Sequence, residues 1–192
     1  MRIARVYPLI ALTLSLGGTV EAQAALRAAP STRATSEVVL TYPQGQGPAG
    51  ATPMKIRLDY GQPHLRGRAI NTDSLVPYDK PWRTGANAAT RLMTDVDLVL
   101  GGATLPKGTY VLFTLPGRAG WKLIIQKDGP TPEITYDAAN DIASVGLRQR
   151  SAAESLESLT MTLIPSTGAG AARGELLISW GTVVLAADWS VK

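Results

Sequence analysis

The chain has 192 residues, of which 45% are hydrophobic and 18% are charged, and its formal net charge is +4. This is the composition of a globular protein with a hydrophobic core, and it excludes disorder as the main state. Nineteen glycines and thirteen prolines favour many turns over long helices, and the lack of cysteine excludes disulfides and thiolate chemistry. The small positive charge, without basic residues interleaved with aromatic ones, excludes a nucleic-acid binder.

The N-terminal segment has the three parts of a signal peptide. Arg2 and Arg5 form a positive n-region, residues 9–16 form an apolar h-region, and Ala-Gln-Ala at 22–24 is a cleavage site. The apolar run is too short to span a bilayer about 30 Å thick, and no later stretch approaches the required length of about 20 residues. We therefore expect cleavage after Ala24, a periplasmic or secreted protein, and no transmembrane anchor in the mature chain.

The first part of the mature chain predicts a lead-in and two strands. Residues 25–36 are rich in alanine, serine and threonine and predict a flexible segment. Strands are expected over residues 37–42 and 54–60, the second from its strict alternation of apolar and charged residues. Between them, residues 45–50 match the glycine spacing of a dinucleotide-binding loop. That motif needs a helix directly behind it, and the sequence predicts none, so no cofactor is expected.

Residues 61–90 predict one long irregular connection, punctuated by glycine and proline. A loop of this length inside a compact domain is usually either functional or disordered. The apolar residues Ile70, Leu75, Val76 and Trp82 argue against disorder. We therefore expect an ordered loop.

Strand patterns resume after the loop and continue to the C-terminus. Residues 101–108 predict a turn, and the segment between Arg150 and Leu156 predicts one helical turn. Trp121, Trp180 and Trp189 lie at strand positions, where packing in the core is the commoner role. The expected strands cover residues 92–100, 109–115, 121–127, 142–150, 159–164, 175–180 and 183–191.

Many short strands joined by turns indicate an all-β fold. We expect a single antiparallel β-sandwich or jelly-roll-like domain of about nine strands over residues 37–192, with one long ordered loop. The residues expected in its core are Ile56, Leu58, Val96, Leu98, Leu112, Leu123, Ile125, Met161, Ile178 and Leu185.

Several strings of the sequence resemble a known family. They are Asp59-Tyr60-Gly61-Gln62-Pro63, Arg66-Gly67-Arg68, Leu75-Val76-Pro77-Tyr78, Trp82-Arg83-Thr84-Gly85-Ala86-Asn87 and Leu105-Pro106-Lys107-Gly108-Thr109-Tyr110. Together they resemble the domain of unknown function 2911 family of exported bacterial proteins. The resemblance implies an exported β-rich domain and no particular reaction. Gln62 stands where the family usually has arginine, and Ala88 stands where it commonly has glutamate, so a family site that used those charges would be weakened here.

The residues that usually carry catalysis or hold a metal are scarce. His64 is the single histidine, no G-x-S-x-G elbow accompanies it, and zinc has too few ligands. Asp95 and Asp97 alternate along a strand and are expected on its wet face. The acidic segment at 137–141 lacks the spacing of a calcium loop and its terminal glutamate. We therefore expect no catalytic residue and no metal site.

The long loop contains the best candidates for binding. Its arginines are forked donors suited to carboxylate, phosphate or sulfate, and its aromatic residues could form a pocket wall. The candidate binding residues are His64, Arg66, Arg68, Tyr78, Trp82, Arg83 and Asn87. The alternative is that the same side chains pin the loop without any ligand. We expect Arg83 to be more buried than a typical arginine and to bind several loop carbonyls or an acid such as Asp79, with Arg66 exposed.

Three classes of function remain open. The first is an exported, non-catalytic binding or accessory protein of the bacterial cell envelope, for example a periplasmic subunit of a larger complex, whose partner is an envelope protein or a small anionic or carbohydrate ligand. The second is a carbohydrate-binding module, which an exposed planar row of Trp or Tyr would favour. The third is an uncharacterised enzyme, which would need a concave pocket with a perturbed acid near Arg83.

Overall fold

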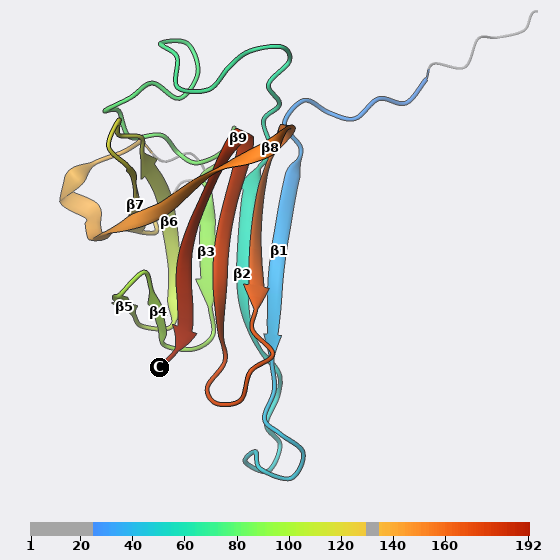
Figure 1. Cartoon of the computed structure of the whole chain (residues 1–192). Coiled ribbons are helices and arrows are strands. Elements are labelled where there is room, and N and C mark those ends of the chain that lie inside the picture. The colour runs from blue at the N-terminus through green and yellow to red at the C-terminus, as the bar shows by residue number, and fades with distance from the viewer. Residues whose placement is uncertain (1–24, 130–134) are drawn as a thin grey trace, which may run out of the picture.

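Nine antiparallel strands form one continuous sheet, which is not closed into a barrel and folds over into two layers (Figure 1). The structure is a computed structural model and describes residues 25–129 and 135–192, so the expected signal peptide lies outside the described residues. The strands are β1 (Arg33–Leu40), β2 (Met54–Gly61), β3 (Arg91–Thr94), β4 (Leu98–Leu100), β5 (Ala103–Leu105), β6 (Gly108–Leu115), β7 (Trp121–Lys127), β8 (Asp141–Pro165) and β9 (Arg173–Val191). Their order in the sheet is β1-β2-β3-β6-β7-β8-β9-β4-β5. The expected all-β antiparallel fold is confirmed.

The core lies between the two layers and follows the alternation of the sequence. In β2, Ile56, Leu58 and Tyr60 point inward and are 0–3% exposed, while the charged residues between them face water. Of the ten residues expected in the core, nine are buried and Val96 is half-buried. Three tryptophans, at positions 121, 180 and 189, are 2–3% exposed, which confirms them as core residues.

Strand β6 is buried on both faces. Its second face packs in a smaller apolar cluster in which Val111, Phe113 and Ile124 are covered by Ala89 and Tyr136. The rings of Phe113 and Tyr136 meet edge to face, with centroids 5.4 Å apart. A strand that is buried on both faces usually has a continuous run of apolar residues, and residues 109–115 have such a run.

Strands β8 and β9 run together as a ribbon that bends near its middle. The pairing shifts register between Ser151 and Leu156 and again before Thr160, and Gly181 on β9 has a φ of 57°. Each strand therefore has two arms, one on either side of the bend (Figure 1). The helical turn expected between Arg150 and Leu156 is wrong. Those residues are strand, because tertiary pairing overrides the weak helical preference of a single turn.

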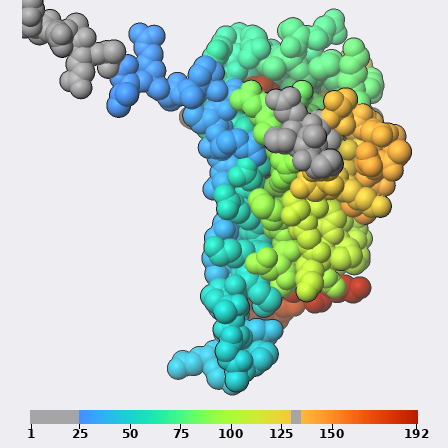
Figure 2. All heavy atoms as spheres, turned by 180° about the vertical axis from the view of Figure 1, so that it is seen from behind, coloured from blue at the N-terminus to red at the C-terminus, as the bar shows by residue number. Residues whose placement is uncertain are grey.

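Other boundaries also differ from expectation. Strand β1 begins at Arg33 rather than at Glu37, so the end of the expected flexible lead-in is part of the sheet. The expected strand at 92–100 is interrupted between β3 and β4, and the expected turn at 101–108 contains β5. The glycine-rich loop at 43–53 is followed by β2 and not by a helix. It extends from the end of the molecule opposite the 62–90 loop (Figure 2).

The interruption between β3 and β4 depends on two carboxylates. Asp95 accepts a hydrogen bond from the backbone N–H of Lys55 at 2.8 Å, and Asp97 accepts one from that of Lys107 at 2.9 Å. Both aspartates are exposed, as expected, but in a bend rather than on the wet face of a continuous strand. Their carboxylates organise local backbone.

The end of β2 depends on a close approach of backbone to backbone. The N–H of Ala86 donates to the carbonyl of Gly61 at 3.2 Å. A Cβ added to Gly61 would lie 1.9 Å from the carbonyl oxygen of Ala86, a distance that no side chain can adopt. Gly85 lies against Gly61 from the loop side, where its own Cβ would meet the Gly61 carbonyl oxygen at 3.0 Å.

We predict that Gly61→Ala destabilises the protein by about 3 kcal/mol, because the loop must move away from β2 to admit the methyl group. Gly146→Ala is the matched control. An added Cβ at Gly146 in β8 meets nothing within 4 Å, so this change should be neutral or slightly stabilising. Urea denaturation of both variants measures the difference. Equal midpoints for Gly61→Ala and the parent would contradict the close approach.

Candidate functional site

The long loop of residues 62–90 crosses one end of the sandwich and is fixed to both layers (Figure 1). Near its start, Leu65 donates its N–H to the carbonyl of Glu157 at 2.8 Å, and Leu159 donates to the carbonyl of Pro63 at 3.0 Å. Further along, Trp82 exchanges two backbone hydrogen bonds with Thr114 of β6, both at 2.8 Å. The loop is therefore ordered, as expected from its apolar residues.

The segment from Trp82 to Thr90 is held mainly by buried contacts. Thr84 and Thr90 are 0% exposed. The Thr90 hydroxyl donates to the carbonyl of Thr84 at 2.9 Å, and the Thr84 hydroxyl donates to the hydroxyl of Thr114 at 3.2 Å. Trp82 stacks on Trp180 of β9 with ring centroids 5.6 Å apart. These contacts fix the segment to the sandwich. Trp82 covers the edge of the core and does not form the wall of an open pocket.

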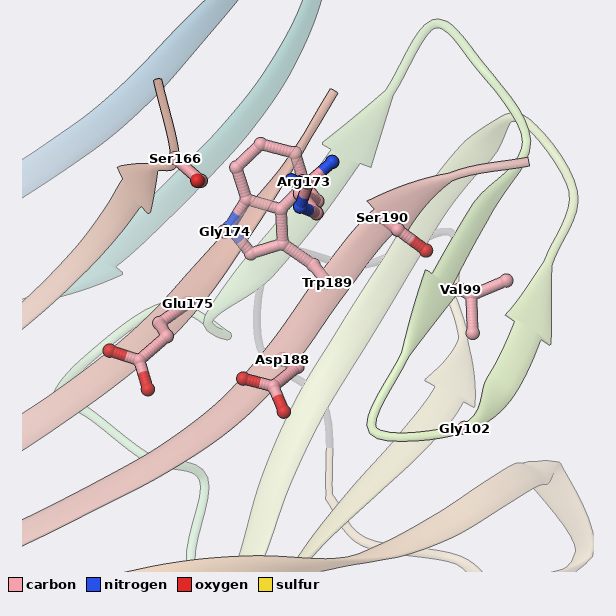
Figure 3. Close-up of a pocket in the computed structure, with 9 residues that line it drawn as sticks. All are labelled: Val99, Gly102, Ser166, Arg173, Gly174, Glu175, Asp188, Trp189 and Ser190. Atoms are coloured by element: carbon pink, nitrogen blue, oxygen red, sulfur yellow. The ribbon is translucent and has the colours of Figure 1, made fainter. Parts of the chain in front are cut away.

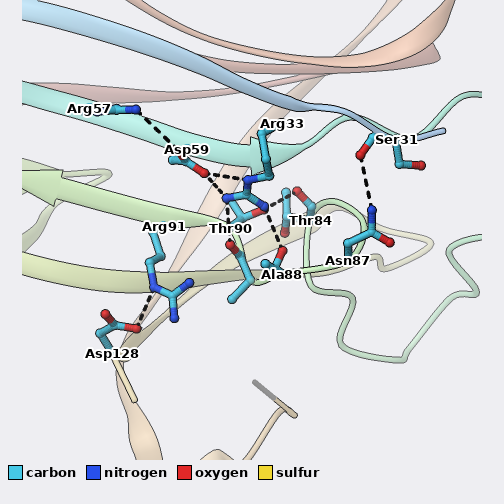
Figure 4. A network of polar contacts seen from close by, with 11 residues as sticks. Ser31, Arg33, Arg57, Asp59, Thr84, Asn87, Ala88, Thr90, Arg91 and Asp128 are labelled. Carbon is cyan, nitrogen blue, oxygen red and sulfur yellow. Dashed lines mark hydrogen bonds and ion pairs between the residues drawn. The ribbon is translucent and has the colours of Figure 1, made fainter. Parts of the chain in front are cut away.

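An arginine from β1 holds the far end of the loop (Figure 4). Arg33 donates to the carbonyls of Ala88 at 3.0 Å and Ala89 at 3.2 Å, and it forms an ion pair with Asp59 of β2. Asn87 reaches the same region, where its amide donates to the carbonyl of Ser31 at 3.3 Å. One guanidinium thus joins the first strand, the second strand and the loop.

The expectation for Arg83 is wrong. Its side chain is exposed and donates a single hydrogen bond, from Nη1 to the carbonyl of Asn87 at 2.9 Å. Arg33 makes the several carbonyl contacts that were expected of Arg83. The role of Arg33 could not be predicted from the sequence. Arg33 lies 55 residues from Ala88 in the chain, and no strand is predicted before residue 37.

Three of the candidate residues gather where the loop meets β8. His64 shares a hydrogen bond of 2.7 Å between its Nδ1 and the hydroxyl of Ser158. Arg68 donates to the carbonyls of Leu65 at 2.9 Å and His64 at 3.0 Å. Arg66 is exposed as expected, and within the described residues its guanidinium has no polar partner.

A hollow of about 300 Å³ lies beside this group, between the loop and the bend of β8 and β9. We call it the Arg68 hollow. The amide oxygen of Asn71 is buried and has no hydrogen-bond partner in the described part of the chain. Asn71 has a φ of 61°, a conformation that asparagine tolerates better than most residues. The lining residues are Leu65, Arg68, Ala69, Ile70, Asn71, Ser155, Gly181, Thr182 and Val183.

The seven candidates therefore do not form one site. His64, Arg66 and Arg68 lie near the β8 bend, and of the seven only Arg68 lines the hollow. Trp82 packs on the core. Tyr78 lies under the guanidinium of Arg118, 4.7 Å from its ring centroid. Arg83 and Asn87 lie near the start of β1. Asn71, Ser155 and Thr182 were missed, because no local pattern shows that residues so distant in sequence share a hollow.

The side chains beside His64 make local hydrogen bonds. The carboxylate of Glu157 accepts from the backbone N–H of Arg66 at 2.7 Å, so it helps to shape the loop. Among residues 25–129 and 135–192, no carboxylate bonds the imidazole, and no three His, Cys, Asp or Glu side chains cluster as metal ligands would. The same residues contain no helix with the length and hydropathy needed to cross a membrane.

A family model now places the chain among known proteins. The model of the family described as protein of unknown function (DUF2911) matches residues 46–188, which run from before β2 almost to the end of β9. The chain belongs to this family. No curated protein and no solved structure matches the chain significantly. At the position where the resemblance implies arginine, the amide of Gln62 donates to the carbonyl of Leu159 at 3.0 Å and so helps to hold the loop.

We predict that Arg33→Ala destabilises the protein by about 1–2 kcal/mol, because it leaves two loop carbonyls and the Asp59 carboxylate with fewer partners. Arg83→Ala is the control from the same region and should change stability by less than about 0.5 kcal/mol. Thermal melts compare the two. A larger loss of stability for Arg83→Ala than for Arg33→Ala would contradict the conclusion that Arg33 holds this end of the loop.

Proposed function

We propose that the protein is an exported, non-catalytic binding protein of the bacterial cell envelope, and that it holds a small anionic or carbohydrate ligand in the Arg68 hollow. The partnerless amide oxygen of Asn71, buried beside Arg68, carries this proposal. A buried polar atom without a partner costs free energy, and a ligand that supplies a hydrogen bond removes that cost.

The lining of the hollow suggests the chemistry of the ligand. Asn71 offers a free acceptor, and Arg68 keeps Nη1 available after its two bonds to loop carbonyls. Ser155 and Thr182 add hydroxyl groups, while Leu65 and its apolar neighbours form a surface for carbon atoms. A ligand that carries both hydroxyl groups and a carboxylate, such as an acidic sugar, would satisfy these groups together.

Export is supported by the sequence of the first 24 residues. The positive n-region, the apolar h-region and the Ala-Gln-Ala site are those of a cleaved signal peptide. A periplasmic or secreted location places the hollow in contact with the sugars and acids of the cell envelope. This location is part of the proposal.

The other two classes have less support. A carbohydrate module that uses a planar aromatic platform needs exposed rings, whereas three tryptophans are 2–3% exposed and Trp82 is stacked on one of them. An enzyme would need a perturbed acid near Arg83. A hydrogen bond from Arg148 lowers the pKa of Asp188, but that pair joins β8 to β9, whereas the hydrogen bond of the Arg83 guanidinium goes to the backbone carbonyl of Asn87.

Binding in the hollow is tested with glucuronate, glucose and acetate by isothermal titration calorimetry on the mature protein. We expect glucuronate to bind more tightly than glucose or acetate, because it alone of the three presents both a carboxylate and hydroxyl groups. Arg68→Gln should weaken binding about tenfold, the loss of one charge-assisted hydrogen bond. Asn71→Gly removes the amide while keeping the positive φ, and it should have a similar effect.

Arg66→Gln is the matched control, because Arg66 is equally cationic and lies outside the hollow. If Arg66→Gln weakens glucuronate binding as much as Arg68→Gln does, the ligand is attracted by the overall positive charge of the loop and the proposed site is wrong. No binding of any of the three probes would reject this ligand class. Export is tested separately by N-terminal sequencing of the protein from a periplasmic extract, where an N-terminus at Met1 would contradict cleavage after Ala24.

A further inference from the structure

Strand β1 is an unprotected edge of the sheet. It pairs with β2 along one side and is paired with no strand on the other, whereas the opposite edge, β5, is only three residues long. Natural edge strands are usually protected by shortness, proline, lysine or a bulge. The end of β1 is Val38-Val39-Leu40, its pairing with β2 has no register shift, and Val39 is 53% exposed.

A groove lies along this edge, between β1 and the second arm of β8. The two strands are not paired in the sheet, and the backbone N–H of Leu163 donates instead to the side-chain hydroxyl of Ser36 at 2.9 Å. Below that contact is a groove of about 390 Å³. We call it the β1 groove. It is lined by residues 37–41, at the end of β1 and just beyond it, and by residues at the connection between β8 and β9. The latter are Pro165, Ser166, Ala172 and Arg173, and Trp189 of β9 completes the lining.

The indole of Trp189 carries a donor with no acceptor. The side chain is 2% exposed, and its Nε1 is buried without a hydrogen-bond partner in the described residues. Figure 3 shows the indole between the two arms of β9, with its nitrogen on the side of Ser166 and Gly174. A neighbouring hollow of about 450 Å³ shares Ser166, Arg173 and Trp189 with the groove. Trp189 therefore borders both spaces, and its donor lacks the hydrogen bond that an occupant could supply.

The charges around the groove leave one cation uncompensated. Glu37 is paired with Lys55 at 2.9 Å. Glu175 and Asp188 are both bonded to Arg148, each at 2.7 Å. Arg173 donates to the carbonyl of Ala169 at 2.8 Å and has no carboxylate partner among the described residues. An occupant of the groove would therefore be favoured by a negative charge.

We propose that the β1 groove binds an extended, largely apolar peptide that carries a free C-terminal carboxylate. The peptide adds a strand to the open side of β1, where its backbone forms the hydrogen bonds that an edge strand leaves unmade. One of its carbonyls accepts from Trp189 Nε1, and its carboxylate pairs with Arg173. Side chains on one face of the peptide lie against Val39, which lines the groove and is 53% exposed. This site is distinct from the Arg68 hollow and does not rest on the function proposed for it.

The probe is a synthetic acetylated hexapeptide of alternating threonine and valine with a free C-terminal carboxylate, measured by isothermal titration calorimetry with the mature protein. Trp189→Phe keeps an aromatic ring and removes the N–H, and Arg173→Gln removes the charge. We expect each variant to bind about tenfold more weakly, the loss of one buried or charge-assisted hydrogen bond. The same peptide with a C-terminal amide should lose about as much as Arg173→Gln causes, and alternate N-methylation of its backbone should abolish binding.

Two matched controls separate binding from folding. Trp180→Phe makes the same change at a tryptophan whose Nε1 donates to the carbonyl of Glu157 at 3.1 Å. Trp180→Phe should lower the melting temperature more than Trp189→Phe does, because only Trp180 loses an existing hydrogen bond. The Trp180→Phe variant should bind the peptide normally. Arg150→Gln removes an exposed arginine outside the groove and should also bind normally.

Three results would overturn the proposal. The first is no binding of the acid peptide to the parent. The second is binding that Trp189→Phe and Arg173→Gln leave unchanged. The third is a concentration-dependent dimer of the unliganded protein that the peptide cannot displace, since a second copy would then occupy the edge. Because none of these readouts uses the Arg68 hollow, failure here is distinguishable from failure of the proposed function.

Discussion

The backbone amides and carbonyls of residues 62–90 need hydrogen-bond partners, and the way in which they find them organises one end of the molecule. Apart from the short bridge between Thr72 and Leu75, this connection forms neither a helix nor a hairpin of its own. It uses the backbone of β8 through Leu65 and Leu159, that of β6 through Trp82 and Thr114, and the side chain of Arg33 from β1. Each partner belongs to a strand that the core already fixes. These bonds fix the loop to the sandwich at several points, and a loop held in this way can form the wall of a hollow.

The same constraint explains why the most distinctive string of the sequence is structural. In Trp82-Arg83-Thr84-Gly85-Ala86-Asn87, the tryptophan stacks on the core, the threonine hydroxyl is buried, and the glycine lies against Gly61. Arg83 and Asn87 of this string are exposed, and each donates a hydrogen bond to a backbone carbonyl. Side chains that suggest recognition by their type are occupied with holding the chain in place. The recognition chemistry that we propose lies instead earlier in the loop, around Arg68 and Asn71.

The parts of the fold that depend on periodicity could be predicted from the sequence, and the parts that depend on long-range contacts could not. Alternation in residues 54–60 placed Ile56 and Leu58 in the core because a strand has only two faces. The bend in β8 and β9 left no such signal, since residues 150–156 can form a turn of helix or a strand, and pairing with β9 decides between them. Of the candidate site, Arg68 could be found from its type. Asn71 could not, because its role arises from burial beside residues far along the chain.

Two of the three buried side-chain atoms that lack a partner in the described residues line hollows, Asn71 Oδ1 at one and Trp189 Nε1 at the other. A protein that bound nothing would gain stability by replacing either group with an apolar one. The two hollows lie toward opposite ends of the sandwich, the first at the bend of the β8–β9 ribbon and the second at the turn that closes it (Figure 1). Strand β9 contributes to both, through Val183 near its bend and Trp189 near its end. A small ligand at one end and a peptide at the other could therefore be held at the same time by one rigid ribbon, without either blocking the other.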